Sequence, residues 1–132
     1  MMTAVLVGVF GMAGALLRFA VDSWFAHRAG RRAAVDSAGR PRHWPWATLI
    51  VNVGGCLIIG LSIGITGRLG LDTAWQLAVA TGLAGGLTTF SSWTTATVRL
   101  LSESRFGAAA LNVGANLAAG FAAAALGIAI AS

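Results

Sequence analysis

The sequence predicts an all-α membrane protein with four transmembrane helices, the third of which is broken at mid-membrane. Hydrophobic residues make up 57% of the 132-residue chain and charged residues only 10%, whereas soluble domains carry about 25% charged residues. Four charge-poor stretches each reach the ~20 residues that a spanning helix needs. The third stretch, Thr73 to Val98, has glycine and hydroxyl residues at its centre, which a continuous helix in lipid normally avoids.

We expect one domain with four spans. They lie at about residues 2–25, 45–67, 74–100 and 107–131 of the single domain 1–132, with an Arg-rich cytoplasmic loop at 27–44. The first stretch lacks the basic start of a signal peptide, so we interpret it as a span. Small residues recur at spacings of three or four, as in Gly8, Gly11 and Gly14 of span one and Gly60 and Gly64 of span two. Such faces favour close helix packing in lipid, and four short helices favour a dimer.

The basic residues are distributed unevenly between the two sides of the membrane. In a four-span topology the first and third connections carry seven arginines and the other side only Arg68. The basic side is expected to be cytoplasmic, which places both termini outside a plasma membrane (a bacterial inner membrane). The net charge of +5 then reflects topology and not a nucleic-acid partner.

Polar residues within the spans are few. All three asparagines lie in spans, Asn52 in the second and Asn112 and Asn116 one helical turn apart in the fourth. They form either interhelical hydrogen bonds or a polar track. Arg18 in span one is a functional-site candidate, or else it pairs with Asp22 or extends to the basic side.

The broken segment offers two chemistries. Carbonyl groups released around Gly85 and Thr88 are hard oxygen ligands that suit a small cation such as sodium. The side chains that follow supply hydroxyl donors and aromatic edges, which are positive and can solvate an anion weakly. These side chains are Thr89, Phe90, Ser91, Ser92 and Trp93. Phe90 and Trp93 are three residues apart and so share a helical face. Aromatic pairs at this spacing are also common where the two rings only pack against each other.

The nonapeptide at residues 85–93, Gly-Gly-Leu-Thr-Thr-Phe-Ser-Ser-Trp, resembles the signature of the Fluc/CrcB family of fluoride channels. Segments 11–18, 46–54 and 116–120 fall in the family's order, so the resemblance covers all four spans. It implies an antiparallel dimer with fluoride pathways along the subunit interface. It also implies export of cytoplasmic fluoride down its electrochemical gradient, which lowers the toxicity of the anion.

The resemblance assigns roles to individual residues. The family's central structural sodium ion would be held by backbone carbonyls of Gly85 and Thr88. Its pore asparagine corresponds to Asn52 and its first pore phenylalanine to Phe90, while its vestibule arginine corresponds to Arg18. The remaining pathway positions fall on Trp93, Asn112 and Asn116.

Two of these positions depart from the family pattern. Trp93 stands where a second phenylalanine is expected, and Asn116 stands where a serine is expected. The uneven loop charge also predicts a single insertion orientation, whereas an antiparallel homodimer needs both. The chain is therefore either a homodimer subunit or the partner of an oppositely oriented paralogue.

Two alternatives to a self-sufficient channel remain at the level of sequence. The chain could be a non-conducting or half-conducting subunit of a heterodimeric fluoride channel. A proton-coupled small multidrug exporter is a rival, but it needs a carboxylate at membrane depth, and Asp22 lies near a span end. An enzyme is not expected, because neither histidine lies in a span and no acidic pair or phosphate loop occurs.

Overall fold

The computed structural model describes residues 1–29 and 44–132, and within them every regular element is a helix. Most of the predicted loop 27–44 therefore lies outside the described residues. The elements are α1 (Met2–Ala29), α2 (Trp46–Leu69), α3 (Thr73–Leu77), the π-helical η1 (Ala78–Ala84), α4 (Gly85–Leu87), α5 (Phe90–Ser102) and α6 (Phe106–Ala131). The four predicted spans correspond to α1, α2, the composite α3–η1–α4–α5, and α6.

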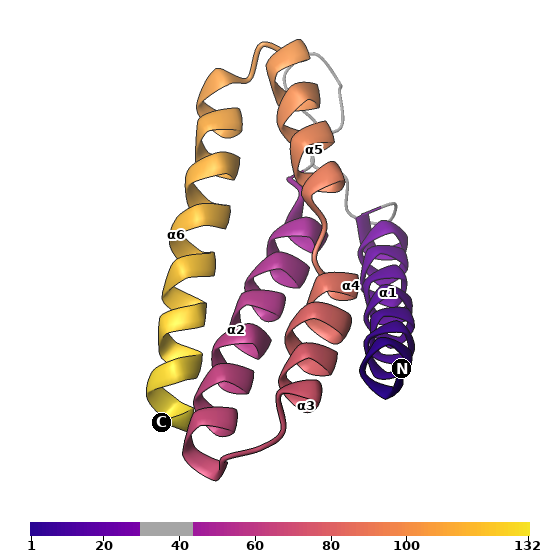
Figure 1. The fold of residues 1–132 in the computed structure, drawn as a ribbon. Coiled ribbons are helices and arrows are strands. Elements are labelled where there is room, and N and C mark those ends of the chain that lie inside the picture. The colour runs from indigo at the N-terminus through magenta and orange to yellow at the C-terminus, as the bar shows by residue number, and fades with distance from the viewer. Residues whose placement is uncertain (30–43) are drawn as a thin grey trace.

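The four spans form a bundle in which both chain ends lie at the same end (Figure 1). Within the described residues, three helices are long and apolar enough to cross a membrane, namely α1, α2 and α6. The third span is divided into shorter pieces by its π-helical stretch and its break, so no single piece reaches that length. A membrane protein with four helical spans is thus confirmed in its helical architecture.

α1 packs against the first half of the third span through glycines. A Cβ atom at Gly82 would lie 2.8 Å from the carbonyl oxygen of Val7, and one at Gly86 would clash with the carbonyl of Gly11. Gly14 is closed in the same way by the backbone of Leu83 and Leu87. Backbones that approach this closely leave room for hydrogen only, which is the packing expected in lipid. Gly8 meets nothing within 4 Å, so the predicted glycine face of span one is correct only from Gly11 onwards.

α2 and α6 pack along their length by the same device. A Cβ at Gly60 would clash with the Ala124 carbonyl, and one at Gly127 would lie 2.6 Å from the Leu57 carbonyl oxygen. Gly64 faces Ala131, where a Cβ would lie 2.6 Å from the alanine Cβ. The small residues that the sequence places in spans two and four therefore form one tight interface.

Local signals in the sequence fix the turn between α2 and α3. Gly70 ends α2 in the left-handed conformation (φ 60°), where glycine carries no steric penalty. Asp72 then caps α3 by accepting a hydrogen bond of 2.8 Å from the backbone N–H of Ala74. The short loop reverses the chain, so that the third span runs back along α2 towards the break.

Candidate pathway at the helix break

The third span is interrupted at two consecutive threonines, where the chain unwinds between α4 and α5 (Figure 1). Thr88 (φ −75°, ψ 157°) and Thr89 (φ −148°, ψ 114°) are extended. The predicted break is therefore confirmed. It falls at the hydroxyl residues of the segment and not at its glycines, because Gly85 is still helical (φ −64°, ψ −38°) and Gly86 packs on Gly11.

Asn52 on α2 holds the break in place. Its Oδ1 accepts a hydrogen bond of 2.9 Å from the Thr89 N–H, and its Nδ2 donates to the Thr89 carbonyl at 3.4 Å. The Thr89 hydroxyl in turn caps α5 by accepting from the Ser92 N–H at 3.1 Å. Unpaired peptide groups are costly in lipid, so the amide of Asn52 makes a break tolerable at this position.

Two carbonyl groups at the break lose the donors that a continuous helix would give them. The Gly85 carbonyl would accept from the Thr89 N–H, but that group is bound to Asn52. The Thr88 carbonyl would accept from the Ser92 N–H, but that group is bound to the Thr89 hydroxyl. Gly85 is exposed, and a Cβ there would meet nothing within 4 Å. Backbone oxygens that have lost their helical donors are chemically suited to a small hard cation.

The three asparagines and Thr97 form one hydrogen-bonded chain that joins α2, α6 and α5. Asn52 Nδ2 donates to Asn116 Oδ1 at 3.0 Å, and Asn116 Nδ2 donates to the Asn112 carbonyl at 2.9 Å. Asn112, fully buried, donates from Nδ2 to the Thr97 hydroxyl at 2.9 Å. In the described residues no buried side-chain nitrogen or oxygen lacks a partner. Of the two interpretations that the sequence allowed, interhelical hydrogen bonds or a polar track, the asparagines of one subunit therefore show the first.

The aromatic pair lies on the far side of the break. Phe90 and Trp93 are in edge-to-face contact, with ring centroids 5.5 Å apart and an interplanar angle of 67°. Phe90 is 72% exposed, so its ring has few neighbours inside the subunit. The indole N–H of Trp93 donates to the Asn112 carbonyl at 3.3 Å and ties α5 to α6. The indole donor is thus engaged with the protein, while the phenylalanine ring remains available.

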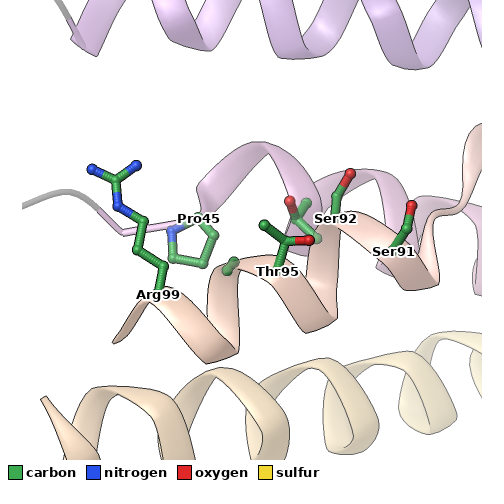
Figure 2. Close-up of a pocket in the computed structure, with 7 residues that line it drawn as sticks. Pro45, Ser91, Ser92, Thr95 and Arg99 are labelled. Atoms are coloured by element: carbon green, nitrogen blue, oxygen red, sulfur yellow. The ribbon is translucent and has the colours of Figure 1, made fainter. Parts of the chain in front are cut away.

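A groove of about 380 Å³ lies between the start of α2 and the face of α5 that follows the break. Its lining is Pro45, Thr48, Ser91, Ser92, Thr95, Ala96 and Arg99, and we call it the hydroxyl groove. Figure 2 shows Ser91, Ser92, Thr95 and Arg99 in succession along α5, with Pro45 beside the arginine. The groove begins next to the break, since two of its lining residues contact Thr89, whose Oγ1 lies 3.2 Å from the Ser91 hydroxyl and donates to the Ser92 hydroxyl at 3.1 Å.

Sequence reasoning assigned Ser91 and Ser92 to the pathway but did not assign the other five lining residues, Pro45, Thr48, Thr95, Ala96 and Arg99. A signal for part of this set was present, since positions 91, 95 and 99 recur every four residues and therefore share a helical face. Other hydroxyls turn inward on their own helix. Thr94 donates to the Phe90 carbonyl at 3.1 Å, and Thr97 to the Trp93 carbonyl at 2.8 Å.

Arg18 lies on α1, one turn beyond Gly14. It is partly buried, and in the described part of the chain it forms no ion pair with Asp22. The predicted pairing of these two residues is therefore absent from this structure. Because α1 runs parallel to the first half of the third span, Arg18 falls past Leu87, towards the α5 side of the break. Its proposed place near a vestibule stays a prediction.

The chain is similar to proteins described as CrcB-like, with a family model (CrcB-like protein, Camphor Resistance) that matches residues 5–128. A relative from Renibacterium salmoninarum, named fluoride-specific ion channel FluC, is 46% identical over 99% of this chain and 100% of its own. Symbiobacterium thermophilum has two similar proteins. FluC 2 is 40% identical over 85% of this chain and 89% of its own, and FluC 1 is 35% identical over 98% and 97%.

Proposed function

The chain belongs to the family of CrcB-like proteins, and from this premise we propose that it is a subunit of a fluoride-selective ion channel. The relatives' names refer to fluoride-specific ion channels. The observation that carries the proposal is the break at Thr88–Thr89, which is followed by the exposed ring of Phe90 and by the hydroxyl groups that line an open groove. Irregular backbone at membrane depth is tolerated where it lines a water-filled cavity.

The pathway is proposed to offer fluoride several weak donors in succession. Fluoride is small and strongly hydrated, so its water must be replaced without trapping the ion, and multi-site weak binding achieves this. The hydroxyls of Ser91 and Ser92, joined to that of Thr89, supply neutral donors. The edges of Phe90 and Trp93 supply weak positive potential. Asn52, Asn112 and Asn116 form the wall behind these groups, with Asn52 nearest to the ion because it binds the Thr89 peptide.

Arg18 is proposed to act at a vestibule and not at the narrowest point. A fixed positive charge near a pore mouth raises the local anion concentration. Within the break itself, residues 85–93 contain no charged side chain, so nothing there would hold the anion too tightly. Arg18 lies towards the α5 side of the break, which is compatible with this role.

A structural sodium ion is proposed at the two released carbonyl groups. The carbonyls of Gly85 and Thr88 have lost their helical donors, and they are hard neutral oxygens. A sodium ion there would take the place of the N–H donors that these two carbonyl oxygens have lost. Two carbonyls are too few to complete the coordination of a hard cation, so the same pair from a second subunit is the natural complement.

The proposed direction of transport is passive efflux. Weak-acid entry of hydrogen fluoride loads the cytoplasm with the anion, and an inside-negative membrane potential favours its exit by about 2.3 kcal/mol per 100 mV. The channel needs no coupled ion for this task. That role fits a chain in which the sequence predicts no ionisable carboxylate at mid-membrane.

The channel is proposed to be an antiparallel dimer with both termini of this chain outside the cell. The seven-to-one bias of basic residues should fix one orientation, so we propose a paralogue of opposite bias as the partner. The two Symbiobacterium thermophilum relatives, FluC 1 and FluC 2, show that two similar chains can occur together in one organism. A reporter fused at the C-terminus should appear on one side only, and an even distribution between both sides would support a homodimer instead.

A second candidate is a non-conducting or half-conducting subunit of a heterodimeric fluoride channel. One observation favours it: the Trp93 indole N–H is occupied by the Asn112 carbonyl, so this aromatic position differs from a plain hydrocarbon ring. A small multidrug-type exporter is less consistent with the site. Asp72 and Glu103 lie at helix ends, outside the apolar cores of the spans.

Fluoride efflux from liposomes tests the proposal. The chain is reconstituted alone and together with any paralogue encoded beside it, and external fluoride is followed with an electrode after a potassium ionophore is added. Fluoride release with the chain alone supports a homodimer, and release only with the pair supports a heterodimer. Chloride that moves as readily as fluoride, or the absence of fluoride release in every combination, would contradict the proposal.

A further inference from the structure

The outer end of the hydroxyl groove is formed by a positively charged side chain, Arg99. This residue lies in the last turn of α5, and its side chain is 58% exposed. Figure 2 shows its guanidinium beside Pro45 at one end of the row of hydroxyl-bearing residues. Among the lining residues that the structure describes, Arg99 is the one with a formal charge. The groove therefore has a cationic mouth and a neutral, hydroxyl-lined interior.

Most of the hydrogen-bonding capacity of Arg99 is unused. Its Nε donates to Glu103 Oε1 at 3.1 Å, whereas within the described residues its terminal nitrogens make no hydrogen bond. A guanidinium carries five N–H donors in a fixed fork, so four of them remain for an anion. Charge-assisted hydrogen bonds of this kind are about twice as strong as neutral ones.

Arg99 shares its carboxylate partner with a second arginine. Glu103 accepts from Arg99 and also from Arg105 Nη1 at 3.4 Å, so two cations share one carboxylate. The hydrogen bond from Arg99 is the largest cause that lowers the pKa of the Glu103 carboxyl, and Arg105 lowers this pKa further. The carboxylate is therefore charged at neutral pH and is held between the two arginines.

The row of hydroxyls leads from this mouth to the break. Thr95 and Ser91 follow Arg99 at intervals of four residues, which correspond to steps of about 6 Å along a helix. Ser91 and Ser92 then contact the Thr89 hydroxyl. An anion attracted to the mouth thus finds neutral donors at every turn of α5. Because Arg99 is exposed and screened by solvent, it attracts without holding the anion strongly.

We propose that Arg99 sets the rate of fluoride entry at the hydroxyl groove, and that Glu103 limits this effect by binding the Nε of Arg99. The inference rests on the proposed channel function and names its entry site. Attraction by a fixed charge falls as ionic strength rises, because the Debye length shortens from about 30 Å at 0.01 M to about 10 Å at 0.1 M salt. A residue that acts by its charge therefore leaves a salt-dependent signature, which a purely structural residue does not.

The test measures the initial fluoride flux of the conducting assembly at low and at physiological ionic strength. Arg99→Gln should lower the low-salt flux about tenfold and flatten its dependence on salt, whereas Arg99→Lys should retain most of the flux because the charge remains. Glu103→Gln should raise the low-salt flux. Arg68→Gln is the matched control, since it removes the same charge at the far end of α2 and should leave the flux unchanged.

Each outcome distinguishes the inference from the proposed function. Wild-type assemblies that release no fluoride would remove both. Wild-type flux together with an Arg99→Gln variant that behaves like Arg68→Gln at every salt concentration would overturn the role of Arg99 alone. If Arg99→Gln fails to assemble, Glu103→Gln and Arg99→Lys decide the matter, and a Glu103→Gln flux at or below that of the wild type would contradict the inference.

Discussion

The two halves of the third span differ in what they pack against and in what they leave open. The first half, α3–η1–α4, is pressed onto α1 by Gly82 and Gly86, and its Ala78 and Ala84 are fully buried. The second half, α5, buries only Leu100 completely and is joined to α6 by the Trp93 indole. Its other face carries the hydroxyl groove. The same span is thus a scaffold before the break and a polar surface after it.

This contrast shows how a broken helix can be stable and accessible at once. The glycine contacts before the break fix the position of Thr88, whose side chain closes on Gly55 of α2. Asn52, one turn before Cys56 on the same helix, then satisfies the Thr89 peptide. Contacts with α1 and α2 stabilise the unwound backbone, so α5 can expose its hydroxyls.

The largest effect is expected from a substitution in the scaffold half. In Gly86→Ala the new Cβ meets the Gly11 carbonyl, so α1 must move away. This should lower the free energy of unfolding by about 1–3 kcal/mol or more. The measurement is the fraction of protein that elutes as an intact assembly after detergent extraction. Gly8→Ala is the control, because nothing lies within 4 Å of that position. Equal behaviour of the two variants would show that the α1 contact does not stabilise the fold.

The next effect is expected at the junction between the halves. Asn52→Ala leaves the Thr89 peptide and the Oδ1 of Asn116 without the hydrogen bonds of Asn52, which should cost about 1–3 kcal/mol and abolish most of the fluoride flux. Ser62→Ala provides a control on the same helix, since the Ser62 hydroxyl bonds only to the Ile59 carbonyl of its own helix. Thermal unfolding in detergent and liposome flux are measured side by side. Wild-type flux in Asn52→Ala would mean that the break does not need the hydrogen bonds of the Asn52 side chain.

A smaller effect, on flux and not on stability, is expected within α5. Ser91→Ala removes an exposed hydroxyl of the groove and should lower fluoride flux several-fold. Thr94→Ala removes a hydroxyl that bonds to the Phe90 and Ser91 carbonyls, so it should have little effect on flux. The comparison decides whether groove hydroxyls, as distinct from hydroxyls in general, carry the ion. A greater loss in Thr94→Ala than in Ser91→Ala would contradict the assignment of the groove.

The smallest expected effect concerns Trp93. Trp93→Phe keeps the edge contact with Phe90 but removes the hydrogen bond to the Asn112 carbonyl. Single interhelical hydrogen bonds in membranes contribute about 0.6 kcal/mol on average, so the melting temperature should fall by only a few degrees. A large loss of assembly would show that the indole has a greater structural role than this single bond.

The sequence predicts the spans well, because charge-poor stretches of sufficient length have few other solutions in a membrane protein. It also predicts that the third span breaks within residues 85–93, but not at which residues of that segment. The break falls at Thr88–Thr89, because Asn52, 37 residues away, competes for the Thr89 peptide. Local propensity does not contain that contact.

Sequence reasoning points to the segment 85–93 as the candidate site, but not to the geometry of that site or to its other lining residues. The released carbonyls of Gly85 and Thr88 follow from two hydrogen bonds that only the packed structure reveals. Thr48 joins the hydroxyl groove because α2 begins beside α5, and Arg99 closes the groove for the same reason. Neither is evident from a pattern within a single helix. The engagement of the Trp93 indole by a backbone carbonyl of α6 is likewise a tertiary contact.

The central claim is that fluoride passes along the exposed side of α5 next to the break, and two phenylalanines test it most directly. Phe90 and Phe121 are exposed to similar extents, 72% and 75%, but only Phe90 lies at the break. Each is replaced by isoleucine in the conducting assembly, and fluoride efflux from liposomes is recorded. Our account predicts a strong loss of flux in Phe90→Ile with intact assembly, and wild-type flux in Phe121→Ile. Equal flux in the two variants would contradict it.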